Sequence, residues 1–340
     1  MIKDVLARIV DGETLDREEA RSVMQLIMRG EATPAQIAGF LVALRIRGET
    51  VDEIAGFAAA MRAAANPIDL ETSGLVDTCG TGGDGADTFN ISTAAALVAA
   101  AAGVRIAKHG NRAVSSACGS ADVLEALGVT LVADQESLRR SLAGAGLAFL
   151  FAPSQHPAMK HAVGPRRELG LRTVFNLLGP LTNPAGARRQ VVGVYDPALV
   201  RPLAEVLGQL GADRALVVHG AGGMDELSLL GATEVAEWNG EEVRTYSVEP
   251  EDAGLTRAGA AELAGGSAPD NADIVRSILA GEPGPRRDIV LLNAGAALQV
   301  GGAAETLSQG VEAAGKAIDS GAASNTLERL VAITSGEAVP

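Results

Sequence analysis

The sequence predicts an α/β fold with a small helical domain and a larger α/β domain whose central sheet is mostly parallel. Two observations predict this fold. The first 66 residues carry only helical patterns, whereas from about residue 74 short apolar segments alternate with helical ones. Such alternation is typical of parallel sheets covered by helices. Because Asn66-Pro67 interrupts the chain, we expect residues 1–66 and 67–340 to form the two domains.

Three helices are expected in the first region. Each is preceded by an Asp or Thr that can cap its amino terminus and is followed by Gly or by Asn-Pro. Pro34 also stands at the first helical position of the second helix, where proline is favoured. The three segments are LDREEARSVMQLIMRG, TPAQIAGFLVALRIRG and TVDEIAGFAAAMRAAANP.

The second region contains apolar segments of strand length. The expected strands cover 75–78, 104–107, 129–132, 147–151, 191–195 and 215–220, and the expected helices cover 92–102, 120–127, 137–143 and 198–210. Residues 233–248 predict a β-hairpin, because Asn239-Gly240 is a typical two-residue turn. Helices are expected again after residue 270.

The composition excludes several classes of protein. The 340 residues are 47% hydrophobic and 21% charged, with a formal net charge of −14. Nucleic acids and anionic membranes attract basic surfaces, and no apolar run reaches the ~20 residues that span a bilayer. The first residues lack the apolar core of a signal peptide, and two cysteines give no disulfide framework. We therefore expect a cytoplasmic protein that binds neither nucleic acid nor membrane.

A glycine-rich segment, DTCGTGGDGADTFNIST (77–93), lies between a predicted strand and a predicted helix. Glycines allow the backbone to wrap an anion, and a helix start adds amides and a positive dipole end. Gly80, Gly82 and Gly85 match the dinucleotide pattern G-x-G-x-x-G, but Asp84 would face a bare pyrophosphate and the helix begins too late. The segment therefore favours another phosphate-bearing ligand, with a surface turn capped by serine as the alternative.

Three further segments carry polar groups that suit anions or a metal. KHGNRAVSSACGSADVLEALG (108–128) holds two cations and several hydroxyl and amide donors, which suit phosphate oxygens. Arg166, in 156–184, can bind a carboxylate through its two-pronged guanidinium. Asp225 and Glu226, in HGAGGMDELS, offer hard oxygen ligands for Mg²⁺ that arrives with a polyphosphate. Taken singly, Arg166, Asp225 and Glu226 are also compatible with solvated surface charge, His109 with a satisfied loop histidine, and Ser120 with a helix cap.

Taken together, the motifs resemble one family. GTGGD, NIST, KHGNRAVSS, GSADVLEALG, RRELGLRTVFNLLGPLTNP and HGAGGMDELS occur in the order found in anthranilate phosphoribosyltransferases, and the resemblance covers most of the chain. It implies the nucleoside phosphorylase/phosphoribosyltransferase type of fold, a homodimer, and a helical segment near 165–185 that completes the small domain. The implied reaction joins anthranilate to phosphoribosyl pyrophosphate (PRPP) with Mg²⁺, giving N-(5-phosphoribosyl)anthranilate and pyrophosphate in tryptophan biosynthesis. A pyrimidine nucleoside phosphorylase and a non-catalytic phosphosugar-binding relative are the alternatives.

The resemblance also implies site residues, and no covalent nucleophile or general base is among them. The implied PRPP contacts are Gly80, Gly83, Asp84, Thr88, Asn90, Ile91, Ser92, Thr93, Lys108, Asn111, Ser115, Ser116 and Ser120. The implied anthranilate contacts are Gly80, His109, Asn111, His156 and Arg166. The implied metal ligands are Ser92, Asp225 and Glu226.

Overall fold

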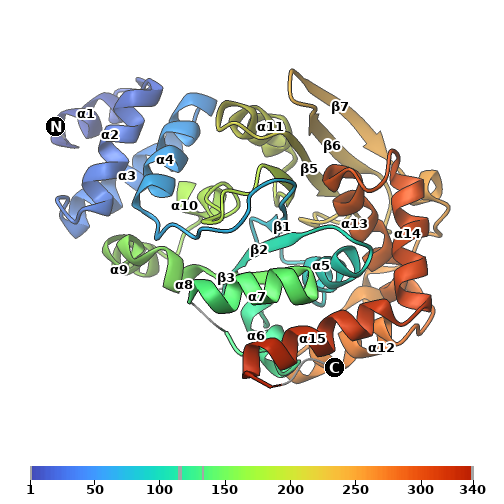
Figure 1. Ribbon diagram of the computed structural model, residues 1–340. Helices are drawn as coiled ribbons and strands as arrows, with labels where there is room; N and C mark the ends of the chain where they lie inside the picture. The colour runs from blue at the N-terminus through green and yellow to red at the C-terminus, as the bar shows by residue number, and fades with distance from the viewer. Residues whose placement is uncertain (1, 114–116, 132–133, 338–340) are drawn as a thin grey trace.

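The computed structural model describes residues 2–113, 117–131 and 134–337. A mixed sheet lies between two groups of helices, with α1–α4 and α9 on one side of the molecule and α12–α15 on the other (Figure 1). The predicted fold class, helices beside a mostly parallel α/β sheet, is confirmed.

The three predicted amino-terminal helices are α2 (Arg17–Met28), α3 (Pro34–Arg47) and α4 (Val51–Ala64). Each begins at the expected capping residue, Asp16, Thr33 or Thr50, whose side chain accepts a hydrogen bond from the third helical amide. The sequence analysis missed a fourth helix, α1 (Ile2–Val10). Its buried Ile2, Val5 and Ile9 recur at spacings of three and four residues, a helical signal within a short segment.

Seven strands form one sheet in the order β3-β2-β1-β4-β5-β6-β7. The first five strands run parallel, while β6 and β7 form the predicted antiparallel hairpin. The strands are β1 (Val76–Gly80), β2 (Ile106–Gly110), β3 (Leu147–Phe151), β4 (Arg189–Gly193), β5 (Arg214–Gly220), β6 (Thr233–Trp238) and β7 (Val243–Val248).

The remaining helices cover the sheet and extend the helical side. They are α5 (Ile91–Ala101), α6 (Ser120–Ala126), α7 (Gln135–Ala145), α8 (Ala152–Gln155), α9 (Lys160–Leu169), α10 (Val174–Leu178), α11 (Val200–Gln209), α12 (Ala268–Leu279), α13 (Pro285–Gly301), α14 (Leu307–Asp319) and α15 (Ala322–Ser335). Helix α9 packs against α2 and α3, and α10 packs against α3 and α4.

The strand predicted at 129–132 is wrong. Residues 129–131 form no strand, and residue 132 lies outside the described residues. The amide of Val129 donates to the carbonyl of Leu124, and the amide of Thr130 donates to Oγ1 of Thr334 at 3.1 Å. The segment is therefore held between α6 and α15, and β3 takes the place beside β2 in the sheet.

A buried carboxylate joins β1 to β2 where the site begins. One oxygen of Asp77 accepts a hydrogen bond from the amide of His109 at 3.1 Å, and the other accepts from Nδ2 of Asn183 at 2.9 Å. Asn183 also donates to the carbonyl of Ala107 at 2.8 Å. Burial raises the pKa of Asp77. This network fixes the carboxyl ends of both strands relative to the segment after α10.

Candidate active site

The predicted polar segments meet at one edge of the sheet. The glycine-rich segment follows β1, the segment 108–128 continues from β2, and the loop with Asp225 follows β5. Because these strands are parallel, their carboxyl ends lie at the same edge, which is where ligands bind in open α/β sheets.

Three carboxylates converge at this edge. The amide of Gly82 donates to Oδ2 of Asp225 at 2.7 Å, and the amide of Asp225 donates to Oδ2 of Asp84 at 3.3 Å. Oε1 of Glu226 accepts from the amide of Ser92 at 3.1 Å. Burial raises the pKa of Asp225 to about 7 and that of Glu226 to about 8, and repulsion between neighbouring carboxylates adds to both shifts.

The donor set fits Mg²⁺ that is shared with a ligand. Asp225, Glu226 and the Ser92 hydroxyl are hard oxygen donors, and a bound cation would offset the repulsion between the carboxylates. Among the residues that the structure describes, no three His, Cys, Asp or Glu side chains are arranged to hold a metal on their own. Magnesium commonly binds through one or two carboxylates together with substrate phosphates, so the ligand would supply the missing oxygens.

Two glycines allow the Asp225 loop to lie against the sheet. A Cβ at Gly193 would lie 1.5 Å from the carbonyl oxygen of Asp225, and a Cβ at Gly80 would lie 2.3 Å from its Oδ2. A side chain at Gly193 would displace the backbone of the loop, and one at Gly80 would displace the Asp225 carboxylate. The predicted site residue Gly80 therefore makes room for a carboxylate of the same site.

The glycine-rich loop leaves several amides free. Within the described part of the chain, the amides of Gly83, Asp84 and Gly85 donate to no protein acceptor. Gly83 and Gly85 have φ of +70° and +74°, which glycine adopts without strain. The loop is anchored by a bridge between Thr88 and Ala264. This arrangement suits the binding of an anion by backbone amides.

The sequence predicts that amides at the start of α5 bind an anionic ligand, but the structure shows one of them bound to a protein carboxylate. Glu226 accepts from the amide of Ser92, while Ile91 and Thr93 are buried. The Thr93 hydroxyl is buried without a hydrogen-bond partner among the described residues. The positive end of the helix therefore stabilises a protein carboxylate, and the free amides lie in the preceding loop.

Lys108 and His109 are consecutive in β2 and point to opposite faces of the sheet. Lys108 is only 2% exposed, and its Nζ donates to the carbonyl of Thr78 and, at 3.3 Å, to Oγ of Ser92. Burial lowers the pKa of Lys108, and the nearby carboxylates oppose that shift. Lys108 thus reaches the metal-ligand candidates through Ser92.

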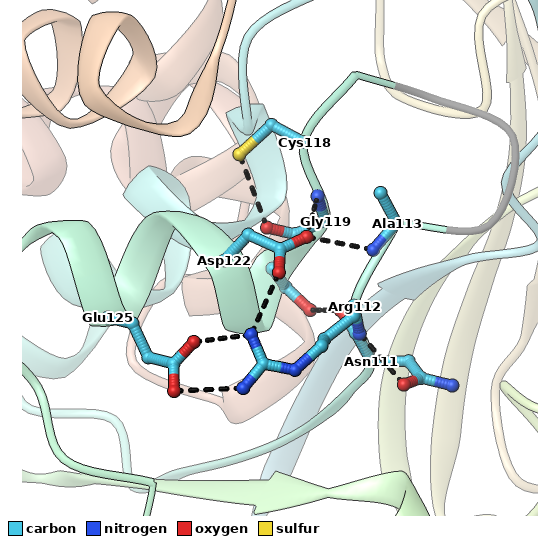
Figure 2. A network of polar contacts seen from close by, with 8 residues as sticks. Asn111, Arg112, Ala113, Cys118, Gly119, Asp122 and Glu125 are labelled. Atoms are coloured by element: carbon cyan, nitrogen blue, oxygen red, sulfur yellow. Dashed lines mark hydrogen bonds and ion pairs between the residues drawn. The ribbon is translucent and has the colours of Figure 1, made fainter.

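Figure 2 shows that the cation of Arg112 is already paired. Its guanidinium binds Glu125 and Asp122 of α6, with Nη2 2.9 Å from Oε1 of Glu125. Asp122 also accepts from the amides of Ala113 and Gly119, both at 2.9 Å. Asp122 therefore links Ala113 to Gly119. The predicted contacts Ser115 and Ser116 lie outside the described residues.

Asn111 and Ser120 lie side by side. The hydroxyl of Ser120 donates to the carbonyl of Asn111 at 3.2 Å. The side-chain oxygen of Asn111 accepts from the amide of Arg112 at 2.8 Å. The Nδ2 donor of Asn111 has no hydrogen-bond partner among the described residues, so it is free for a ligand.

Asn90 connects three segments that are distant in the chain. Its Nδ2 donates to the carbonyl of Cys118 at 3.1 Å, and its Oδ1 accepts from Nδ2 of Asn271 at 2.9 Å. Asn271 is buried in α12 and accepts from the amide of Gly266 at 2.7 Å. Sequence analysis did not select Asn271. Its only signal is a polar residue on the buried face of a helix.

His109 and His156 form a buried pair, with ring centroids 5.1 Å apart. Nδ1 of His109 lies 3.2 Å from the carbonyl of Gly179, which can only accept, so this nitrogen carries the proton. Burial lowers the pKa of His109 to about 3, and it also lowers the pKa of His156. Nε2 of both rings has no partner among the described residues. The pair therefore presents neutral polar groups.

Arg166 lies in α9 and packs over an aromatic ring of α10. Its guanidinium carbon is 5.2 Å from the centroid of the Phe175 ring, and burial lowers its pKa. Among the described residues no carboxylate forms an ion pair with it. A half-buried arginine without an anionic partner is suited to bind an anionic ligand.

Comparison with known proteins decides the family. Residues 72–324 match the model of a glycosyl transferase family a/b domain, and residues 3–65 match the helical bundle domain of such a family. The anthranilate phosphoribosyltransferase of Moorella thermoacetica is 56% identical over 332 residues, with 98% of each chain covered. That of Citrifermentans bemidjiense is 54% identical, with 98% of this chain and 99% of the relative covered. The chain belongs to the anthranilate phosphoribosyltransferase family. The predicted family and enzyme class are confirmed.

Solved structures of this family have the same fold. The Thermus thermophilus enzyme is 50% identical with a TM-score of 0.92, covering 98% of this chain and 99% of that one. The Saccharomyces cerevisiae enzyme, solved in complex with PRPP and Mg, is 27% identical with a TM-score of 0.90 and 98% of both chains covered. Among the described residues of this family member, no helix is long and apolar enough to cross a membrane.

Proposed function

We infer that the protein transfers the phosphoribosyl group of PRPP to the amine of anthranilate, releasing pyrophosphate. One observation carries this inference: free loop amides lie beside the carboxylates of Asp225 and Glu226. A bare anion would be repelled by these carboxylates, whereas a diphosphate that brings Mg²⁺ satisfies both the amides and the carboxylates.

We propose that the residues around the glycine-rich loop bind PRPP. Free amides of the loop bind phosphate oxygens, while Asn90, Asn111 and Ser120 supply polar side chains around the same edge. Asp225, Glu226 and Ser92 hold the metal. Lys108 orients the Ser92 hydroxyl, because its Nζ donates a hydrogen bond to Oγ of Ser92. Bound Mg²⁺ would offset charge on the departing diphosphate. The remaining proposed PRPP contacts are Gly80, Gly83, Asp84, Thr88, Ile91, Thr93, Ser115 and Ser116.

We propose that anthranilate lies on the side of Arg166, His109 and His156. Arg166 binds the carboxylate through its two-pronged guanidinium, and Gly80 and Asn111 complete the contacts. The unpartnered Nε2 of neutral His109 suits a hydrogen bond from an N–H donor such as the aromatic amine.

The reaction needs positioning more than proton transfer. An aromatic amine is unprotonated at neutral pH, so it attacks the anomeric carbon of the ribose without a strong general base. The residues must hold the amine in line with the departing diphosphate and stabilise the charge that leaves with it. Preorganised donors and positioning each lower such barriers by several kcal/mol.

The decisive experiment follows anthranilate fluorescence after mixing folded protein with PRPP and MgCl₂. We expect fluorescence to decrease only when all components are present, and EDTA to stop the decrease. Replacing PRPP by phosphate and anthranilate by a pyrimidine nucleoside should give no turnover. A folded, metal-supplied protein that leaves anthranilate unchanged would overturn the inference.

We also propose that the protein is a cytoplasmic homodimer. Val10 and Ile46 are 69% and 82% exposed, and they lie on α1 and α3, which pack together. Large apolar side chains exposed on adjoining helices suit contact with a second copy of the chain.

We propose that residues 1–66, with the segment near 165–185, form the small domain and that residues 67–340 form the α/β domain. The packing of α9 and α10 against α2–α4 supports this division.

A further inference from the structure

We propose that Arg172 is a further substrate-binding residue, which binds the diphosphate of PRPP from the helical side of the site. Arg172 lies in the connection between α9 and α10, six residues after Arg166. The proposal rests on the function inferred above and adds a cation to a phosphate site otherwise assigned to residues of the sheet edge.

The guanidinium of Arg172 lies against the glycine-rich loop. Its Nε and Nη2 are both 3.3 Å from the position that a Cβ of Gly83 would occupy. Its Cζ is 4.4 Å from the centroid of the Tyr195 ring. The planar group is thus held between an aromatic ring and a loop residue that has no side chain, a typical arrangement for an arginine that recognises phosphate.

Tyr195, whose ring lies against the Arg172 guanidinium, is tied to the same loop. The amide of Tyr195 donates to Oγ1 of Thr81 at 3.1 Å, and the amide of Thr81 donates to the carbonyl of Gly193 at 3.0 Å. The ring that supports the guanidinium and the loop that faces it are therefore both anchored at the end of β4.

The positive charge of Arg172 has no counter-ion in the described part of the chain. Arg172 forms neither an ion pair nor a hydrogen bond there, although Asp84 is adjacent to Gly83 in the same loop. Arg112 of the second segment, in contrast, is paired with Glu125 and Asp122. An exposed arginine that lies against an aromatic ring beside free amides is available to an anion.

The position favours the diphosphate over the carboxylate of anthranilate. Gly83 follows Gly82, whose amide binds the metal-ligand candidate Asp225 at 2.7 Å. A diphosphate that shares a metal with Asp225 would therefore lie on this turn. Arg166 packs over a different ring, that of Phe175, whereas Arg172 packs over Tyr195. The two arginines of one segment would then bind the two anionic substrates separately.

The test compares R172Q, R172K and Y195L with R167Q, a matched control at an exposed arginine of the same segment. KM is measured separately for PRPP and anthranilate, and calorimetry measures the Kd of inorganic diphosphate with MgCl₂. We expect R172Q to raise the KM for PRPP and the Kd of magnesium diphosphate by about 10-fold or more, because a charge-assisted hydrogen bond is lost. The KM for anthranilate should change less than about two-fold.

R172K should keep part of the affinity, because it retains charge without the planar fork, and Y195L should weaken diphosphate binding less than R172Q does. R167Q should behave as the wild type. Unchanged diphosphate affinity in R172Q, or a rise confined to the KM for anthranilate, would overturn the proposal. If wild-type protein gives no turnover, the inferred reaction fails, while calorimetry with magnesium diphosphate still decides whether Arg172 binds this anion. Circular dichroism of each variant identifies any that does not fold.

Discussion

The carboxylate of Glu226 accepts a hydrogen bond from the backbone amide of Ser92 at 3.1 Å, across 134 residues of sequence. The contact places a half-buried carboxylate at the positive end of α5, which stabilises its charge. Burial and the neighbouring Asp225 nevertheless raise the pKa of Glu226 to about 8. The site therefore gathers more negative charge than its own donors stabilise, which is consistent with a site that binds a cation.

Replacing Glu226 by glutamine should separate activity from stability. The amide keeps the size of the side chain and an oxygen that can accept from Ser92, but it cannot carry the carboxylate charge. We expect kcat/KM to fall by about 10²–10³-fold, because an electrostatic contact to the metal is lost. The free energy of unfolding of the ligand-free protein should increase, because the amide has no charge for burial and the neighbouring Asp225 to disfavour. Steady-state kinetics and urea denaturation measure the two effects.

The control for this variant is E242Q, at an exposed glutamate of the β6–β7 hairpin. It should leave both activity and stability within experimental error. If E226Q keeps the wild-type rate and the wild-type dependence on MgCl₂, Glu226 does not hold the metal.

Adding one methyl group at Gly193 should disrupt the site by displacing the backbone of Asp225. The new Cβ would occupy the place of the Asp225 carbonyl oxygen, only 1.5 Å away, so the loop must move. We expect G193A to lose most activity and to lower the free energy of unfolding by about 1–3 kcal/mol. The control G315A lies in α14, where a Cβ meets no atom within 4 Å, and should be neutral or slightly stabilising. Wild-type activity in folded G193A would contradict a fixed position for Asp225.

Local chemistry explains which parts of the fold could be predicted from the sequence. The capping residues Asp16, Thr33 and Thr50 act within one helical turn, so their effect is visible in the sequence. The segment 129–132 is apolar like a strand, but Thr130 bonds to Thr334 instead of joining the sheet. That choice depends on a helix about 200 residues later, and no local pattern contains it.

The same limit applies to the site. The motifs indicated which segments carry polar groups, but not which groups are already used by the protein. Arg112 is as basic as Arg172 in the sequence, yet only Arg112 meets carboxylates, which lie on α6. Lys108 lies in a motif that suits phosphate binding, yet its ammonium group is buried and donates to Thr78 and Ser92. Whether a charged side chain already has a partner within the protein depends on tertiary packing, so only the structure can show it.

Introducing a charge at Ile46 should separate the proposed dimer. Ile46 is 82% exposed on α3, so I46E costs little in the folded monomer but would bury a charge in an apolar interface. Light scattering coupled to size exclusion should show a dimer for the wild type and a shift to monomer for I46E. The control T245E adds the same charge on the distant strand β7 and should remain dimeric. A wild-type monomer, or a dimeric I46E, would contradict an interface at Ile46.

Buried His109 should make the protein sensitive to acid. Its pKa is about 3 in the folded state, because burial disfavours the charged ring and both His156 and Lys108 add repulsion. In the unfolded chain the pKa returns to about 6.5, so the unfolded state binds more protons. The contribution to stability is complete above pH 6.5 and is lost as pH falls toward 3, by roughly 2 kcal/mol at pH 5.

Asparagine at position 109 provides the test, because it cannot be protonated and its amide can still donate to the carbonyl of Gly179. Urea denaturation at pH 7.5, 6 and 5 should give a steeper loss of unfolding free energy for the wild type than for H109N. The variant should be less stable at pH 7.5, because a buried ring is replaced by a smaller side chain, but its dependence on pH should be shallower. H156N should flatten the profile too, since burial also lowers the pKa of His156. Parallel pH profiles for the wild type and H109N would show that His109 is protonated without cost in the folded protein.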